Sequence, residues 1–366
     1  MTIAVKRVTT ALSHIEEGIP VIVTGHASEG GYSCLVVAGE RATRATIAYM
    51  MRETTGPIHA VISNSRSAAL DLRTIRADCD DRQLSSFTVP IDHHTVRGRF
   101  AADDSAITLR AMADPLACPR DFVRPGRIYP VECDDRGVLA VSDHFNGALD
   151  LIRIAGLGEV AAAGLLAAAS GSPATPIGVR EFADATGTLF VGADDIRDYR
   201  LTTELVIDAS STVNLPTVHG TFRATAFRSL HDGCEHLTMH MGDPRANENI
   251  DAKAIVHVHR ECLSGDTLRS TACACRERLQ RSLASIAAEQ RGILVYLRSH
   301  AHMSPATTTS VYPLDRTIIE THVIRQVLTS LGMEVSPDRL QEILIGSEGC
   351  VGSVSPGRYA RSMLVC

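Results

Sequence analysis

Three cysteines in the C-terminal half of the chain have a spacing that suits a metal ion. Cys262 is followed by Cys273 and Cys275 in a C-x10-C-x-C arrangement. Zinc prefers four tetrahedral sulfur and nitrogen ligands, and a site with only three protein ligands keeps a fourth position for water, as hydrolysis requires. Because cysteine is among the most buried residue types, three buried free thiols are the alternative to a zinc site.

Acid–base side chains lie close to these cysteines in the sequence. His259, Glu261 and Asp266 flank Cys262. Carboxylates and imidazoles can move protons beside a metal-bound water, and an imidazole can also be a fourth metal ligand. We therefore regard Glu261 and Asp266 as candidate catalytic residues.

Two histidines, His300 and His302, follow the apolar run 294–298. If that run is a strand that continues, both imidazoles point to one face, because strand side chains alternate. They would then be further catalytic or metal-binding candidates. The alternative is a pair of polar histidines on a surface loop.

The elements that must position these groups divide into two units. A chain of 366 residues is longer than one hydrophobic core usually supports. As far as Tyr199, short β-branched runs alternate with helical stretches, which indicates α/β or α+β layering. The polar run 210–212 and Pro216 are typical of a boundary between two domains. We predict one domain over residues 1–207 and another over 208–366.

Apolar spacing predicts the main elements of the second domain. We expect a strand over 254–259, a helix over 275–290 and a buried strand over 292–298. A last helix over 316–331 would end at Gly332, because glycine is a common C-cap residue.

Composition narrows the class of partner. A formal charge of −6 and a pI near 6.2 provide no basic face for nucleic acid or an anionic membrane, so we expect a small-molecule partner. The most apolar stretch, 154–169, is too short to span a bilayer and contains Glu159, which favours a buried helix. The first residues lack the apolar segment of a signal peptide, so we expect a cytoplasmic protein.

The cysteine segment resembles GTP cyclohydrolase II. Residues 257–266 read H-V-H-R-E-C-L-S-G-D and are followed by Ser270 and by C-A-C at 273–275. The usual text of that family is R-V-H-S-E-C-L-T-G-D, then G-S-x-R-C-D-C-G. Residues 292–298 resemble its central strand. The resemblance implies zinc at the three cysteines and nucleotide contacts at His257, His259, Arg260 and Arg298.

The upstream half resembles 3,4-dihydroxy-2-butanone-4-phosphate synthase. The segments 87–89 (F-T-V), 113–115 (A-D-P) and 121–126 (D-F-V-R-P-G) carry this likeness, together with His144 and the residues after it. The two resemblances cover nearly the whole chain in the order used by the bifunctional riboflavin-pathway enzyme. The chain is therefore identified as a divergent member of that family, with an α/β fold in two domains, and we expect a homodimer.

The synthase half departs from its family at the groups that do chemistry. The family's acidic loop, D-x-E-D-R-E-N-E-G-D, is replaced here by residues 26–34, in which Glu29 is the one carboxylate, and its G-H-T-E motif reads D-H-F-N at 143–146. Magnesium and manganese prefer several oxygen ligands, so His144 with Glu29 should bind them poorly. We expect this domain to have lost synthase activity.

The cyclohydrolase half departs as well. The family's Q-E-G-R-G is replaced at 300–304, and its catalytic D-x-R falls on Thr317 and Ile319 when counted back from Gly332. Each lost guanidinium contact to a triphosphate removes about 1.5–3 kcal/mol. These losses argue against tight GTP binding in the family manner.

Three functions remain open at this point. One is a zinc-dependent hydrolase redirected to a different purine nucleotide or related heterocycle. The second is an inert paralogue in which zinc holds the fold and the protein acts as a binding or regulatory partner. The third is authentic GTP cyclohydrolase activity through relocated residues.

Overall fold

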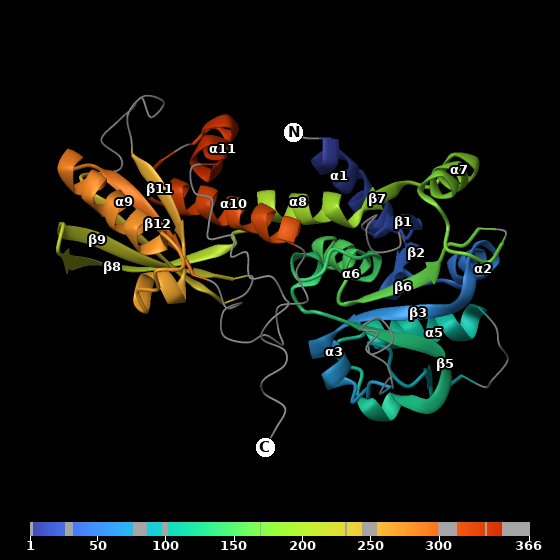
Figure 1. The fold of residues 1–366 in the computed structure, drawn as a ribbon. Coiled ribbons are helices and arrows are strands. Elements are labelled where there is room, and N and C mark those ends of the chain that lie inside the picture. The colour runs from blue at the N-terminus through green and yellow to red at the C-terminus, as the bar shows by residue number, and fades with distance from the viewer. Residues whose placement is uncertain are drawn as a thin grey trace, which may run out of the picture. The chain divides into compact units, whose positions relative to one another are not determined.

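The computed structural model describes residues 3–25, 32–75, 86–96, 102–168, 170–230, 233–243, 255–298, 313–333 and 335–345. The chain forms two compact units, Met1–Thr203 and Glu204–Cys366, whereas the sequence predicts a boundary between 207 and 208. Each unit contains its own sheet with helices packed against it (Figure 1).

The N-terminal unit is built around a mixed seven-stranded sheet in the order β4-β5-β3-β6-β2-β1-β7. The pairs β1–β7 and β3–β5 are parallel and the other neighbours are antiparallel. The strands are β1 (Val21–Thr24), β2 (Ser33–Ala38), β3 (Thr55–Ser63), β4 (Ile91–His93), β5 (Phe122–Cys133), β6 (Val160–Leu165) and β7 (Phe190–Gly192).

Helices cover both faces of this sheet. Strand alternation sends Ile22 into one core and its neighbours Val21 and Val23 into the other. The first core is closed by α2 (Arg44–Glu53), α5 (Ala102–Ala113) and α7 (Pro176–Thr186), and the second by α1 (Ile3–Glu16), α6 (His144–Ile154) and α8 (Ala193–Thr203). The short helix α3 (Asn64–Ala69) follows β3. The result is a three-layer α/β/α unit.

Strand β6 shows that the expectation of a buried helix over 154–169 is wrong. Helix α6 ends at Ile154, and Gly156 and Gly158 then have φ angles of 71° and 78°, which a right-handed helix does not contain. Because β6 is a central strand buried on both faces, it is apolar throughout and lacks the alternation that distinguishes a strand from a buried helix.

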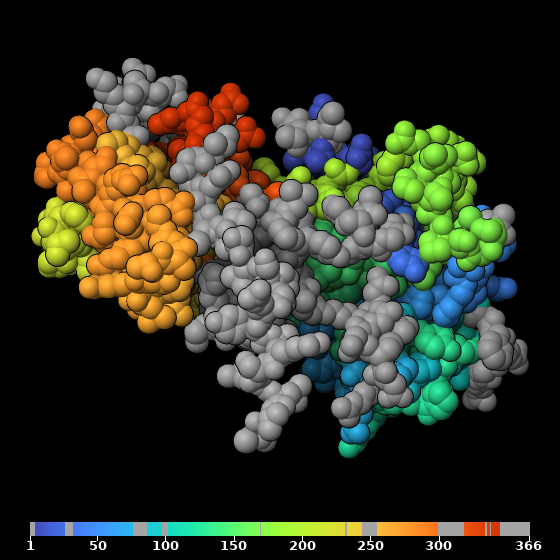
Figure 2. Space-filling view, viewed as in Figure 1, coloured from blue at the N-terminus to red at the C-terminus, as the bar shows by residue number. Residues whose placement is uncertain are grey.

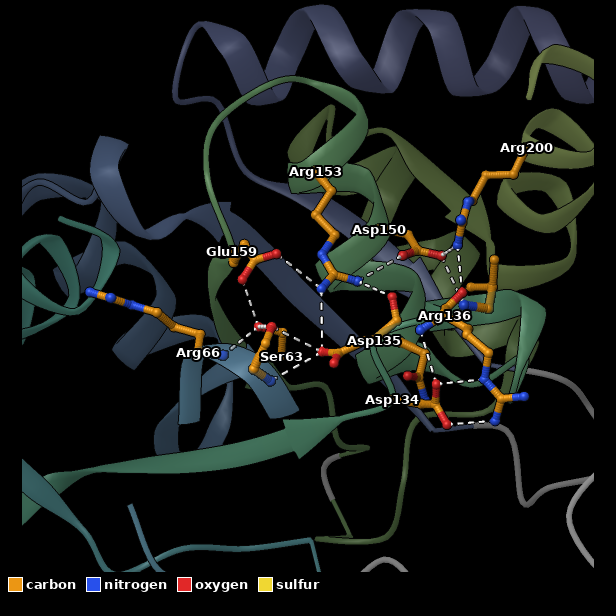
Figure 3. A network of polar contacts seen from close by, with 12 residues as sticks. Ser63, Arg66, Asp134, Asp135, Arg136, Asp150, Arg153, Glu159 and Arg200 are labelled. Carbon is orange, nitrogen blue, oxygen red and sulfur yellow. Dashed lines mark hydrogen bonds and ion pairs between the residues drawn. The ribbon is translucent and has the colours of Figure 1, made fainter. Parts of the chain in front are cut away.

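A network of ion pairs fixes the C-terminal part of α6 (Figure 3). Asp150 is 1% exposed, and its carboxylate accepts hydrogen bonds from the Val138 amide at 2.8 Å and the Arg200 guanidinium at 2.7 Å. Arg153 reaches Glu159 at 3.2 Å. Burial raises the pKa of Asp150, and Arg200 opposes this shift. Since a buried carboxylate depends on its partners, the network locks α6 against α8.

The C-terminal unit contains a five-stranded sheet in the order β11-β12-β10-β9-β8. Phe222, Met239 and Leu294 point from one face of the sheet toward Leu283 and Ile286 of α9. The elements are β8 (Ile207–Thr217), β9 (Gly220–Ser229), β10 (Glu235–Met241), β11 (Val256–Arg260), α9 (Cys275–Glu289), β12 (Gly292–Leu297), α10 (Pro313–Ser330) and α11 (Pro337–Ile345).

Two strands and a helix of this unit agree with the sequence-based expectations, but α10 is not the last helix. Helix α11 follows it and begins at Pro337, with Ser336 accepting a hydrogen bond from the Arg339 amide. A serine cap followed by proline is a common helix start, so the sequence contained a signal for α11. In the described part of the chain, no helix has the length and apolar character needed to cross a membrane.

Candidate metal and catalytic site

The three cysteines that the sequence singled out lie together in the C-terminal unit. The Sγ atoms of Cys262, Cys273 and Cys275 are all within 4.8 Å of one another, and those of Cys262 and Cys273 are 3.7 Å apart. Two thiolates held at about 2.3 Å from one tetrahedral zinc ion are about 3.8 Å apart, so the donor set fits this metal. Among the described residues, no other histidine, cysteine or carboxylate belongs to the group.

Two elements bring the sulfur atoms together. Cys262 follows β11 and precedes the turn η5 (Leu263–Thr267), while Cys275 begins α9. The part of the unit that carries this segment is the orange surface in Figure 2. Cys262 and Cys273 are partly exposed, whereas Cys275 is buried. The Ser264 hydroxyl, 3.4 Å from the Cys262 sulfur, is the largest cause that lowers the pKa of this thiol. A lowered pKa favours the thiolate, which is the form that binds metals.

Gly265 leaves the space in which the sulfur atoms meet. A Cβ atom at this position would lie 2.6 Å from the Cys273 sulfur and 3.3 Å from the Cys262 sulfur. The Gly265 amide also donates a hydrogen bond to the Cys262 sulfur at 3.4 Å. A residue without a side chain is therefore needed here for the three sulfur atoms to converge.

Asp266 is a hydrogen-bond acceptor for the cysteine turn. Its Oδ2 atom accepts hydrogen bonds from the Cys262 amide at 3.0 Å and the Tyr296 hydroxyl at 2.8 Å. The same oxygen lies 3.0 Å from Nε2 of His259, whose ring stacks on Tyr296. Burial and then Asp266 raise the pKa of Tyr296, so the hydroxyl stays protonated as a donor. These contacts hold the turn in place, and proton transfer by Asp266 stays a prediction.

The predicted nucleotide-binding residues divide between the two faces of the sheet. His257 and His259 lie on the α9 face, because their partners in β12 are Leu294 and Tyr296. Arg260 lies on the opposite face, where its Nε atom is 2.8 Å from the Glu320 carboxylate of α10. The structure thus separates Arg260 from the two histidines, and their binding roles stay predictions.

Glu261 and Arg298 lie at the ends of neighbouring strands. The Glu261 carboxylate is 3.7 Å from Nε of Arg298, and its side chain is 23% exposed. Glu261 directly precedes Cys262, so its carboxylate is the partly exposed acid nearest to the cysteines in the sequence. His300 and His302 lie outside the described residues, and their proposed roles stay predictions.

The N-terminal unit holds the histidine of the synthase-like motif at the start of α6. His144 is 3% exposed, and its Nε2 atom has no hydrogen-bond partner among the described residues. Burial lowers the pKa of His144 to about 3, and the neighbouring His59 adds to this shift. The Asn146 amide group donates to the Asp143 carboxylate at 3.0 Å. Glu29 lies outside the described residues.

Sequence reasoning missed two parts of the site. It gave no role to Tyr296, although a single aromatic residue in the aliphatic strand 292–297 was a usable signal. It also gave no role to Gly265. The contact between Arg260 and Glu320 could not be found, because it joins residues far apart in the chain.

Comparisons with known proteins agree with this architecture. A family model for 3,4-dihydroxy-2-butanone 4-phosphate synthase matches residues 9–199, and one for GTP cyclohydrolase II matches residues 208–329. Riboflavin biosynthesis protein RibBA of Salinispora arenicola is 33% identical over 291 residues, which cover 79% of this chain and 68% of the relative. RibBA of Mycobacterium marinum is 32% identical over 296 residues, which cover 80% and 70%.

Solved structures show the same fold. RibBX, a two-domain 3,4-dihydroxy-2-butanone 4-phosphate synthase from A. baumannii, superposes with a TM-score of 0.72 at 22% identity and covers 90% of this chain and 94% of its own. A 3,4-dihydroxy-2-butanone 4-phosphate synthase in complex with two magnesium ions gives a TM-score of 0.51 at 25% identity, covering 54% of this chain and 97% of its own.

A three-layer α/β unit followed by a five-stranded unit with a cysteine cluster defines a two-domain protein of the riboflavin biosynthesis class. The chain belongs to the family of bifunctional riboflavin biosynthesis proteins, which join a 3,4-dihydroxy-2-butanone 4-phosphate synthase domain to a GTP cyclohydrolase II domain. Members of this family are enzymes. The family and the two-domain α/β fold that the sequence predicted are confirmed.

Proposed function

We propose that the C-terminal unit is a zinc-dependent hydrolase of the GTP cyclohydrolase II type that acts on a purine nucleotide or a related heterocycle. The convergence of three cysteine sulfur atoms carries this proposal, with 3.7 Å between those of Cys262 and Cys273 and a lowered pKa at Cys262. A structural site with four protein ligands would be closed to substrate. The most obvious fourth ligand, His259, directs its Nε2 atom to Asp266 instead.

The residues of the chain have separate tasks in this proposal. Cys262, Cys273 and Cys275 would hold the zinc ion, which when bound supplies a Lewis acid that lowers the pKa of a coordinated water. The Glu261 carboxylate is partly exposed, and Glu261 is adjacent to Cys262 in the chain. We therefore propose that this carboxylate would act as the general base that accepts a proton from the water. Asp266 fixes the turn that carries Cys262.

We further propose that the N-terminal unit has lost synthase chemistry and its magnesium or manganese site. At the position of the family's glutamate, Asn146 carries an amide, which cannot take up a proton as a base can. That amide already donates to Asp143. His144 is neutral, because burial and then the neighbouring His59 lower its pKa. No carboxylate among the described residues is a cause of this shift.

The second candidate is an inert paralogue in which zinc only holds the fold. Ile319 supports it, because counting back from Gly332 places this residue where the family has its catalytic arginine. The Ile319 side chain lies within α10 and is 7% exposed. An isoleucine buried in a helix cannot replace a guanidinium group that contacts substrate.

The two candidates are separated by measuring bound metal and turnover in one preparation. We expect about one zinc per chain and release of formate, or opening of another purine ring, that is lost in Cys273→Ser. Zinc without turnover on any purine nucleotide tested would favour the structural role. Absence of zinc from the wild-type protein would refute both candidates.

A further inference from the structure

A cleft of about 690 Å³ lies in the C-terminal unit on the face of the sheet that points away from α9. It is formed by β8, β9 and β10 together with the C-terminal end of α10. On β9, Phe222 packs toward α9, so its neighbour Arg223 points to the opposite face. On β10, Met239 and Met241 likewise place His240 between them on the cleft side. Volumes of 300–1,000 Å³ are typical of small-molecule sites.

The cleft is separate from the cysteine cluster. His240 pairs with Arg223 on one side and with Ile293 on the other, whereas Arg260, next to the cysteine turn, pairs with Leu297. The two sites are therefore four residue pairs apart along the sheet, or about 13 Å at ~3.3 Å per residue. They also lie on opposite faces, since the cysteines adjoin α9.

The chemistry of the cleft centres on His240 and Arg223. His240 is 3% exposed, and its Nδ1 atom has no hydrogen-bond partner among the described residues. Such orphaned buried polar atoms are uncommon and call for a ligand or a bound water. Burial and the charge of Arg223 lower the pKa of His240, against the influence of Asp243. The imidazole is therefore neutral, while the Arg223 guanidinium provides the positive charge.

The rest of the lining is mainly polar. Ser210 and Thr225 contribute hydroxyl groups to the lining, and Asp243 contributes a carboxylate. Arg223 is exposed and forms no ion pair within the described part of the chain. A guanidinium recognises a phosphate with two parallel hydrogen bonds. A carboxylate and a neutral imidazole suit the hydroxyl groups of the same molecule.

We propose that this cleft is a second ligand site, which binds a small hydroxylated phosphate monoester with its phosphate on Arg223 and a hydroxyl group on Nδ1 of His240. The proposal does not depend on zinc or on hydrolysis in the same unit. It assigns a function to a face of the sheet that the cysteine site leaves unused.

Glycerol 3-phosphate is a suitable probe, because it combines a phosphate with two hydroxyl groups. We would titrate it into the full-length protein by calorimetry and follow the His240 imidazole by ¹⁵N NMR, with the signal assigned from His240→Gln. We expect saturable binding that shifts this signal and weakens at least tenfold in Arg223→Gln, the effect of losing one charge-assisted contact.

Arg228→Gln is the matched control, because Arg228 is exposed on the same strand but does not line the cleft. It should bind the probe as the wild type does. Equal affinity in the Arg223→Gln and wild-type proteins would overturn the proposal. So would binding that leaves the His240 signal unchanged, since the probe would then occupy another site.

Discussion

Gly265→Ala tests whether the three cysteines form one metal site. The added methyl carbon would lie 2.6 Å from the Cys273 sulfur, 3.1 Å from the Cys275 Cβ and 3.3 Å from the Cys262 sulfur. Carbon and sulfur atoms that are not bonded normally stay about 3.5–4 Å apart. The Cys273 sulfur must therefore move by roughly 1 Å to accommodate the methyl group.

The consequence depends on whether a metal is bound. In the metal-free protein the Cys273 side chain can rotate to another rotamer, at a cost of about 1 kcal/mol or less. In the zinc-bound protein the sulfur is restrained, because metal–ligand distances tolerate only about 0.2 Å. We expect zinc affinity to fall at least tenfold, or about 1.4 kcal/mol, with little change in the stability of the metal-free protein.

Competition with a chromogenic chelator would measure the zinc affinity, and thermal unfolding with and without zinc would measure stability. Gly178→Ala is the control, since its Cβ would meet only the Thr175 hydroxyl at an ordinary 3.5 Å. If Gly265→Ala takes up zinc with wild-type affinity, the inference that the three sulfur atoms share one metal is refuted.

Three further predictions concern polar side chains of the two units. Asp266→Asn should weaken zinc binding about tenfold in the same chelator assay, and an unchanged zinc affinity would contradict the positioning role of Asp266. Tyr296→Phe should have a smaller effect, because it removes only one of the hydrogen bonds to Asp266. His144 has an ordinary pKa near 6.5 when unfolded and about 3 when folded, so its stabilising contribution is complete above pH 6.5 and is lost as the pH falls from there toward 3. By pH 5 the free energy of unfolding should have fallen by about 2 kcal/mol through this group. Urea unfolding should therefore show a smaller fall in the free energy of unfolding between pH 7 and pH 5 for His144→Gln than for the wild type. Arg200→Met should lower the free energy of unfolding by about 3 kcal/mol, because it removes the closest partner of buried Asp150. Adding Asp150→Asn should restore most of this stability; if it restores none, the lost ion pair does not explain the destabilisation.

The sequence predicted the architecture well wherever the signal is local. The helix at 275–289 shows a helical spacing of apolar residues, and the strand at 292–297 is an apolar run. The cysteine triplet and its flanking residues mark the candidate metal site in the sequence alone. It failed at 154–169, because a strand buried on both faces has the same apolar run as a buried helix.

The tertiary structure decided what neighbouring groups do to one another. Only the pairing of β11 with β12 places Tyr296 beside His259 and Asp266, and only the packing of α10 joins Glu320 to Arg260. Likewise, the cleft at Arg223 and His240 requires β8, β9, β10 and α10 together. Residue types and local spacing determined the family and the fold class and indicated the candidate metal ligands, because these signals depend only on the order of residues along the chain. Burial, orphaned polar atoms and long-range ion pairs depend on packing between distant segments, which the chain acquires only when it folds.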